Sequence, residues 1–445
     1  MSQVASNVAD YVAAQQLVAN TLPAAGTEWL DIRRDQARTR LAAVGLPSTQ
    51  QEDWKYTNIR SITRSLFSPV SEPSLWNDQA FLADVQVVGL DSYQLVFADG
   101  ILLPELSRCE GLPAEVTVAS MADILQRNSG RAEEHLGSAL PGSPHGFTVM
   151  NSSFIRDGVF VEIGPGIELD KPIELLFVCA CSGESQLSLP RNLILGRPGS
   201  RATVIERYLS AVEARSLTNT VSEVLLENGA QLTHQRIVDE SSRSFHIGGL
   251  FARLNRDSHL AACSMTLGGA LVRNDVLVNL DATGAKVDLT GLYLAHGRNH
   301  VDNHTHVVHN FPGGTSREFY KGILDDRSRA VFHGRITVQT DAQQSDSEQS
   351  NQNLLLSRDA EIDTKPQLEI YADDVKCGHG ATVGQLDERS VFYLRSRGVD
   401  EAQARRILTY AFAGEILDKI GPDTLRAHLE ERVNKLFLRT EPATG

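Results

Sequence analysis

The sequence of 445 residues contains no apolar run long enough to cross a membrane, so a membrane-spanning protein is unexpected. The first 20 residues lack the positively charged start and the uninterrupted apolar core of a secretory signal. We therefore expect a chain that works in the reducing cytoplasm. At this length it should form more than one compact unit, or one elongated unit.

Basic clusters are also absent, and the formal net charge is −14. A surface that binds nucleic acid is therefore unexpected. The sequence has neither a G-x-x-x-x-G-K-[ST] loop nor a glycine-rich dinucleotide fingerprint, so a partner must supply any nucleotide energy that the system uses. Aromatic residues make up only 6% of the chain. Together with the missing secretion signal, this scarcity argues against a β-helix enzyme that acts on polysaccharides.

Cysteine is scarce, and its pattern suggests no pairing. The five cysteines are odd in number and form no C-x-x-C pair, which fits free thiols rather than a disulfide framework. Cys179 and Cys181 share one face of an apolar run, so we expect both in the core. The chain by itself lacks an obvious four-thiolate set for a stable iron–sulfur cluster. The five positions are Cys109, Cys179, Cys181, Cys263 and Cys377.

Helical periodicity marks both ends of the chain. Residues from about 4 to 20 and from 27 to 44 carry apolar positions at helical spacing. Near the C-terminus, Asp400 can cap a helix with an apolar stripe, and a second helix follows to about Phe437. These two helices could cap the open end of a neighbouring domain or form a docking surface, and the sequence does not choose between the two.

Between these ends, short runs rich in Val, Ile, Leu and Thr alternate with turns that contain Gly, Asp, Asn or Ser. A turn-then-strand phrase recurs, mostly at intervals of roughly 27 to 32 residues, with one longer step of about 43. A period of this size, built of strands and turns, predicts a β-solenoid with stacked coils. The phrases begin at Gly199, Gly229, Asp257, Gly284, Arg327 and Asp359.

The predicted organisation has three parts. They are an N-terminal helical region (1–85), a β-helix core (86–397) and a C-terminal helical domain (398–445), with a helical insertion near 121–136 in the core. Within the core, the polar segment 340–353 could be a disordered loop or a polar face of one coil. We favour the coil, because stacked amide side chains can hydrogen-bond along a β-stack.

Histidines gather in one short stretch, at His296, His300, His304, His306 and His309. His300, His304 and His306 share the parity of Asp302, so one strand would present them on the same face. Two interpretations remain. The cluster could bind a metal in a self-contained β-helix enzyme, or it could form a solvated or stacked polar face. We favour the second, because the glutamate expected of a cupin-type site is missing.

The most informative motif is Cys377-Gly378-His379. In a strand, Cys377 and His379 leave the same face, with Cα atoms about 7 Å apart. That spacing suits two ligands that hold one metal atom better than a nucleophile and its base, which must touch. Sulfur beside an imidazole nitrogen suits iron, zinc or an iron–sulfur species. The alternative is structural, with a buried cysteine and a hydrogen-bonded histidine that close a strand.

Several further stretches accompany this motif. In the C-terminal part they are Lys321–Ile323, Phe332–Ile336, Gln352–Leu356, Pro366–Ile370 and Phe392–Gly398. Near the N-terminus stands the phrase Glu52-x-Trp54-Lys55-Tyr56-Thr57. In these stretches the chain resembles the SufB/SufD family of scaffold subunits for iron–sulfur cluster assembly, and it looks most like the SufD branch.

The resemblance implies a fold and a function. It implies a right-handed parallel β-helix with N-terminal and C-terminal α-helical segments. It also implies a non-catalytic scaffold that pairs with SufB through the C-terminal coils and docks the ATPase SufC on the C-terminal helices. Paired scaffold folds of this kind can also form a homodimer when the chain is alone.

The resemblance also assigns residues. Cys377 and His379 match positions that face a SufB cysteine, where a nascent cluster is held, and His379 is the better ligand candidate. The expected cofactor is therefore a transient iron–sulfur cluster or iron shared with the partner, and no tightly bound cofactor is expected in the isolated chain. His309 lies in a family-like context without an assigned role.

Overall fold

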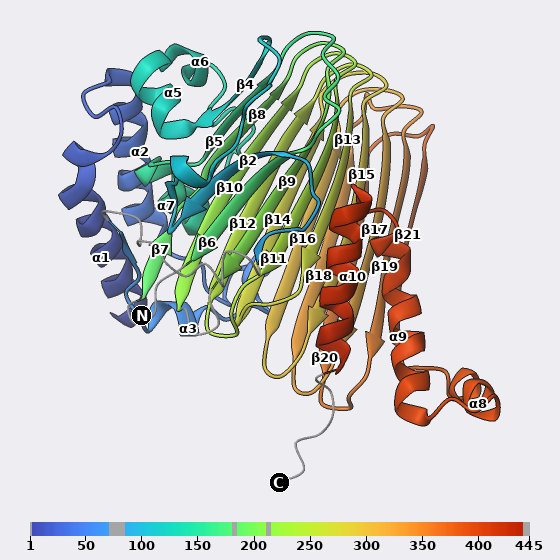
Figure 1. Ribbon diagram of the computed structural model, residues 1–445. Coiled ribbons are helices and arrows are strands. Elements are labelled where there is room, and N and C mark those ends of the chain that lie inside the picture. The colour runs from blue at the N-terminus through green and yellow to red at the C-terminus, as the bar shows by residue number, and fades with distance from the viewer. Residues whose placement is uncertain (1, 71–84, 180–184, 211–214, 439–445) are drawn as a thin grey trace.

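The computed structural model describes residues 2–70, 85–179, 185–210 and 215–438 (Figure 1). It consists of a long stack of parallel strands, with helices at the N-terminal end and along one side. The helices are α1 (Ser2–Val18), α2 (Glu28–Val44), α3 (Arg60–Thr63), α5 (Met121–Asn128), α6 (Gly130–Glu133), α7 (Gly146–Phe154), α8 (Glu388–Ser396), α9 (Glu401–Leu417) and α10 (Asp423–Leu438). Short 3-10 helices are η1 (Ala19–Thr21), η2 (Glu52–Trp54) and η3 (Pro104–Leu106).

Two sheets form the solenoid, and the chain passes from one sheet to the other in about seven turns. The first sheet contains β20 (Glu361–Ile370), β18 (Arg329–Val338), β16 (His300–His309), β14 (Leu271–Leu280), β12 (Phe245–Leu254), β10 (Ser216–Leu226), β8 (Arg191–Gly196), β5 (Val159–Ile163) and β4 (Val116–Ser120), with β1 (Ser68–Pro69) and β7 (Gln186–Ser188) beside it. The second contains β21 (Lys376–Gly384), β19 (Asp346–Leu355), β17 (Thr315–Leu324), β15 (Lys286–Ala295), β13 (His259–Thr266), β11 (Gln231–Asp239), β9 (Arg201–Ser210), β6 (Ile173–Cys179), β2 (Tyr93–Ala98) and β3 (Ile101–Leu102).

The predicted β-solenoid is therefore confirmed, and its physical basis is alternation. Successive residues of a strand face opposite sides of the sheet, and the parallel register stacks equivalent residues of neighbouring coils. Val287, Leu289 and Tyr293 of β15, for example, all point into the main apolar core between the sheets. This stacking buries each coil against the next one.

The turns explain the recurring phrase. Gly199, Gly229 and Gly284 each precede a strand of the second sheet and have φ angles of 69°, 71° and 74°. Glycine adopts this left-handed conformation without the steric penalty of other residues. The longer step of about 43 residues has a simple cause, because the Arg327 and Asp359 phrases precede strands of the first sheet. The step thus spans one and a half coils, and the stacking is not interrupted.

Two sequence interpretations agree with the structure and one needs adjustment. The polar segment 340–353 contains most of β19, which pairs with β17 and β21, so it is an ordered coil and not a loop. The N-terminal helices lie within two residues of their predicted bounds. The expected helix over 121–136 is split into α5 and α6, and Ser120 caps α5 by accepting a hydrogen bond from the Asp123 amide at 3.3 Å.

The C-terminal boundary differs from the prediction. The last strand ends at Gly384 and α8 starts at Glu388, whereas the prediction extended the β-helix core to residue 397. Asp387 explains the earlier start, because its carboxylate accepts a hydrogen bond from the Arg389 amide at 3.1 Å and caps the helix. The predicted cap of α9 is confirmed, since Asp400 accepts from the Gln403 amide at 2.8 Å.

The two C-terminal helices do not cover the end of the solenoid. They lie along the outer face of the second sheet (Figure 1). Ile416 and Leu429 of these helices share an apolar cluster with Met265, Leu292 and Ile323 of the sheet. Buried Lys321 of β17 adds an ion pair to Glu415 of α9 at 2.9 Å. Of the two roles left open for these helices, the cap is therefore wrong.

No helix among the described residues is long and apolar enough to cross a membrane.

Candidate functional site

Cys377 and His379 lie on β21, the last strand of the second sheet. Among the described strands, β21 pairs with β19 alone, so its other edge carries no further strand. Cys377 is half-buried and His379 is exposed. In the parallel register Cys377 lies beside Ser347, and His379 lies beside Gln349. The two predicted site residues therefore sit on the inward-facing rows of side chains, at the point where the stack ends.

A hydrogen-bonded row runs beneath Cys377. The Ser316 hydroxyl donates to Ser347 Oγ at 2.8 Å, and Nε2 of His309 lies 2.9 Å from Ser316 Oγ. All three side chains are buried. Burial lowers the pKa of His309 to about 4, so the imidazole is neutral at physiological pH. His309, which had no role assigned from its sequence context, thus anchors the row under Cys377.

A second row runs beneath His379. Gln349 donates from Nε2 to Oε2 of Glu318 at 2.6 Å, and both side chains are buried. Burial raises the pKa of Glu318 to about 7, because a carboxylate loses its hydration inside the solenoid. Glu318 and Gln349 were not identified from the sequence. The signal was present in the alternating polar residues of β19, where Ser347, Gln349, Asn351 and Asn353 all face inward.

The chemistry of Cys377 fits a ligand better than a nucleophile. Partial burial raises the pKa of its thiol, and the negative charge of Asp346 raises it further. A thiol with a raised pKa is mostly protonated at neutral pH and reacts slowly. A metal ion can still bind it by displacing the proton. This electrostatic setting disfavours a nucleophilic cysteine, in agreement with the spacing argument.

Cys377 and His379 do not form a complete metal site. In the part of the chain that the structure describes, neither belongs to a group of three metal-ligating side chains. The described cysteines form no disulfide, and Cys179 is buried as predicted; Cys181 lies outside the described residues. Any cluster at this position therefore needs further ligands from another molecule or from sulfide.

The histidine stretch divides between the two faces of β16. His309 points inward, whereas His300 and His306 belong to the outward row. Nε2 of His300 lies 2.8 Å from the Thr57 hydroxyl, and Nε2 of His306 lies 2.9 Å from that of Thr337. Burial lowers the pKa of His306 to about 4. The outward row thus contacts the N-terminal segment, so much of it is packed rather than solvated.

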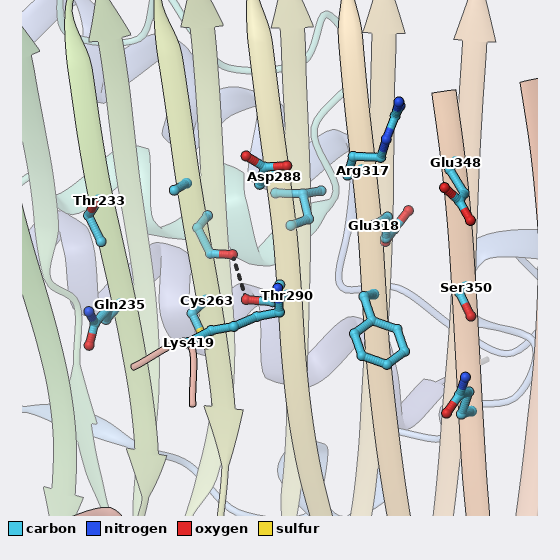
Figure 2. A pocket seen from close by; sticks show the side chains of 15 residues that line it. Thr233, Gln235, Cys263, Asp288, Thr290, Arg317, Glu318, Glu348, Ser350 and Lys419 are labelled. Carbon is cyan, nitrogen blue, oxygen red and sulfur yellow. Dashed lines mark hydrogen bonds between the residues drawn. The ribbon is translucent and has the colours of Figure 1, made fainter. Parts of the chain in front are cut away.

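A groove lies on the outer face of the second sheet, beside the C-terminal helices (Figure 2). It has a volume of about 700 Å³, and Lys419 reaches over it. Cys263 lines it, and burial raises the pKa of that thiol to about 11. Among the described residues, Cys263 belongs to no group of three metal-ligating side chains. No histidine is among the residues that line the groove, so it does not repeat the cysteine–histidine pair of β21.

The structure is a parallel β-solenoid flanked by helices. Similarity of the sequence to known proteins identifies the family of the chain. Residues 178–412 match the family model described as the SUF system FeS cluster assembly SufBD core domain, and residues 6–175 match the SufBD protein N-terminal region. The chain belongs to the SufB/SufD family of iron–sulfur cluster assembly proteins.

Two relatives illustrate this membership. An iron–sulfur cluster assembly SufBD family protein of Synechocystis sp. is 32% identical over 411 residues, covering 90% of each chain. The iron–sulfur cluster assembly protein SufD of Escherichia coli is 32% identical over 399 residues, covering 89% of this chain and 90% of that protein. The resemblance inferred from the sequence motifs is confirmed.

Proposed function

We propose that this chain is a non-catalytic scaffold subunit that holds a nascent iron–sulfur cluster together with SufB. The observation that carries the proposal is the placement of Cys377 and His379 on the last coil, above two buried polar rows. The chain supplies one sulfur and one nitrogen ligand there. The thiolates missing from this chain would come from the partner, and the cluster would be transient.

The last coil also supports a protein interface. Ile370 of β20 and Val383 of β21 occupy inward-facing positions, yet 40% and 49% of their surfaces are exposed because no described coil follows. Edge strands also present unpaired backbone groups, which attract another strand. SufB is the proposed occupant, and a second copy of this chain can take the same place when SufB is absent.

The C-terminal helices offer a second surface. Phe392 and Tyr393 of α8 are 70% and 58% exposed, and Ile407 of α9 is 42% exposed. Exposed aromatic side chains of this kind are common anchors of protein interfaces. We propose that this surface docks the ATPase SufC, which would supply the energy of nucleotide hydrolysis.

Replacing His379 with Ala tests the cluster site. We expect cluster content of the complex co-purified with SufB to fall at least about tenfold, because one ligand is lost, while the complex still forms. Iron and acid-labile sulfide content and visible absorbance measure the cluster, and size analysis measures the complex.

Lys376→Ala is the matched control, because Lys376 lies on the same strand and faces the opposite side. Normal cluster content in His379→Ala would overturn the assignment of His379. Loss of cluster in both variants would point to a general defect of β21 and would equally contradict a specific ligand role.

A further inference from the structure

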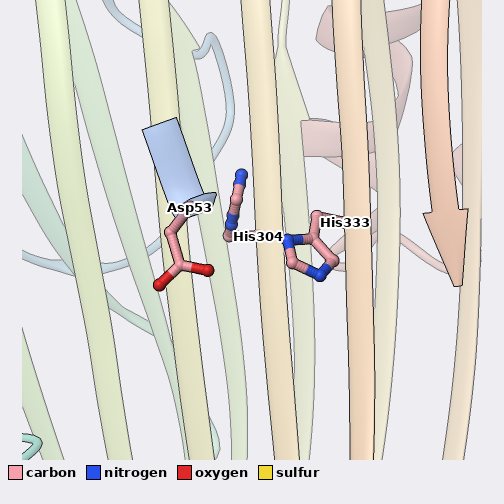
Figure 3. Close-up of side chains that lie close together, drawn as sticks. All are labelled: Asp53, His304 and His333. Atoms are coloured by element: carbon pink, nitrogen blue, oxygen red, sulfur yellow. The ribbon is translucent and has the colours of Figure 1, made fainter. Parts of the chain in front are cut away.

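Three metal-ligating side chains meet on the outer face of the first sheet, away from β21. They are Asp53 of η2, His304 of β16 and His333 of β18 (Figure 3). One ligand atom from each lies within 4.8 Å of the others. The two imidazoles are register neighbours on adjacent coils, with ring centroids 4.8 Å apart at an interplanar angle of 74°. Sequence reasoning missed this group because Asp53 is remote from both histidines.

The contact of His333 with Gln367 determines which ring nitrogen is available. Nε2 of His333 lies 2.6 Å from Oε1 of Gln367. An amide oxygen only accepts, so Nε2 carries the proton and Nδ1 keeps its lone pair. Figure 3 shows one ring nitrogen of His333 turned toward His304 and Asp53. This is the usual arrangement of a histidine ligand, in which the distal N–H is fixed by a second group.

His304 is held in a comparable way. Its Nε2 lies 3.0 Å from Oδ1 of Asp302 and 3.3 Å from a guanidinium nitrogen of Arg273. These two contacts hold the imidazole ring of His304 in place. Asp302 is itself fixed, because it accepts hydrogen bonds from Thr57 at 2.5 Å and from Arg273 at 2.8 Å.

The surroundings suit a small cation. A narrow hollow at this position is lined by Asp53, His304 and His333, and also by the carboxylates of Glu52, Asp302 and Asp363. Lys365 is a positive side chain on its wall, and it is paired with Glu52 at 2.7 Å. His333 is buried and His304 is half-buried, whereas Asp53 is exposed. One side of the group therefore stays open to a water ligand.

We propose that Asp53, His304 and His333 form a binding site for a divalent first-row transition metal ion, Zn²⁺ or Fe²⁺. Two imidazole nitrogens and one carboxylate, with an open position, form a ligand set that both ions accept. The ion would fasten the N-terminal segment to two successive coils of the solenoid. It would reinforce Arg273, which donates to the backbone oxygen of Asp53 at 2.7 Å and stacks on Trp54 at 3.8 Å.

The site is independent of the proposed cluster site, and the test keeps the two apart. The starting protein is the full chain with Cys377→Ala and His379→Ala, from which bound metal has been removed. Titration with Zn²⁺, with Co²⁺ as a spectroscopic probe, and with Fe²⁺ without oxygen should each give one equivalent. The relative affinities then show whether Zn²⁺ or Fe²⁺ is preferred.

Asp53→Asn should weaken binding at least about tenfold, because an amide is a much poorer ligand than a carboxylate. Asp53 is exposed, so this variant should fold normally. Asp363→Asn lines the same hollow but lies outside the group and serves as the control. The ion should also slow proteolysis of the N-terminal segment in the control and not in Asp53→Asn. Absence of stoichiometric binding, or equal binding by both variants, would overturn the proposal.

Discussion

At the residue scale, buried polar side chains form hydrogen-bonded groups inside the solenoid. Glu206, His234 and Arg236 form one in the earlier coils, and another lies under Cys377 and His379. Ser316 and Glu318 lie inside the solenoid, where Val287 and Leu289 occupy the same rows one coil earlier. Gln349 follows Glu318 one coil later. Burying such groups costs stability unless they are hydrogen-bonded. The buried carboxyl group of Glu318 carries such a cost, because burial raises its pKa.

Glu318 makes this cost measurable through pH. Its pKa is about 7 in the folded chain, above the ordinary value of 4.5. Between these two values the unfolded chain releases a proton that the folded chain keeps, so the stability contribution of Glu318 falls as pH rises. Glu318→Gln removes this dependence, and its amide oxygen can still accept from Gln349.

We expect Glu318→Gln to raise the free energy of unfolding by up to about 3 kcal/mol near pH 8, with a difference that shrinks toward pH 5. Urea unfolding of both proteins across this range measures it. Glu348→Gln, on the exposed face of the neighbouring strand, should show no comparable trend. A difference between Glu318→Gln and wild type that stays constant with pH would contradict the raised pKa of Glu318.

At the element scale, the local sequence predicts where strands and helix caps lie, but it does not predict which strands pair with one another. The turn phrases locate the starts of strands correctly, but they do not reveal which sheet each strand joins. Asp387 and Asp400 are both readable as caps, and only the second was used to place a helix boundary. The early start of α8 matters, because it places Phe392 and Tyr393 on an exposed helix.

The exposed face of α8 leads to a prediction about the ATPase. Changing Phe392 and Tyr393 to Ser should reduce recovery of SufC in a pull-down at least about tenfold, because aromatic anchors contribute much of an interface. These side chains are exposed, so the fold should persist. Leu17→Ser is the control, since Leu17 is 83% exposed on a helix at the other end of the chain. Unchanged recovery of SufC would exclude α8 from the docking surface.

At the scale of the whole molecule, the solenoid is closed at one end and open at the other. N-terminal helices and the antiparallel strand β4 cover the first coils, whereas β20 and β21 form sheet edges without a described covering element. Long uncovered edges promote association, and proteins commonly protect them with charged residues. The open end therefore belongs to an assembly interface in our proposal.

Introducing charge at this end tests that interface. Ile370→Lys together with Val383→Lys should weaken the complex with SufB at least about tenfold, because two buried ammonium groups would lose their hydration. Size analysis of co-expressed chains measures the effect. Val88→Lys changes a residue that is 89% exposed elsewhere and should leave the complex intact. A complex of normal size and affinity in the double variant would refute the open-end interface.

By itself, the sequence determined the strand-rich solenoid, the helical ends, the free cysteines and the family. These properties are local or compositional, since strand alternation, turn glycines and caps each depend on a few neighbouring residues. The motif of Cys377 and His379 was likewise visible, and the cysteine pattern led to the prediction that any cluster there takes further ligands from a partner.

Only the tertiary structure decided which side chains lie above one another. Stacking register depends on the summed length of every strand and turn in a coil, so it brings Glu318 beneath Gln349 and His379 without any local signal. The same holds for Asp53 beside His304 and His333, and for the C-terminal helices that lie along the sheet and leave its end open. Contacts between residues distant in sequence are set by packing of the whole coil stack, which no short pattern records.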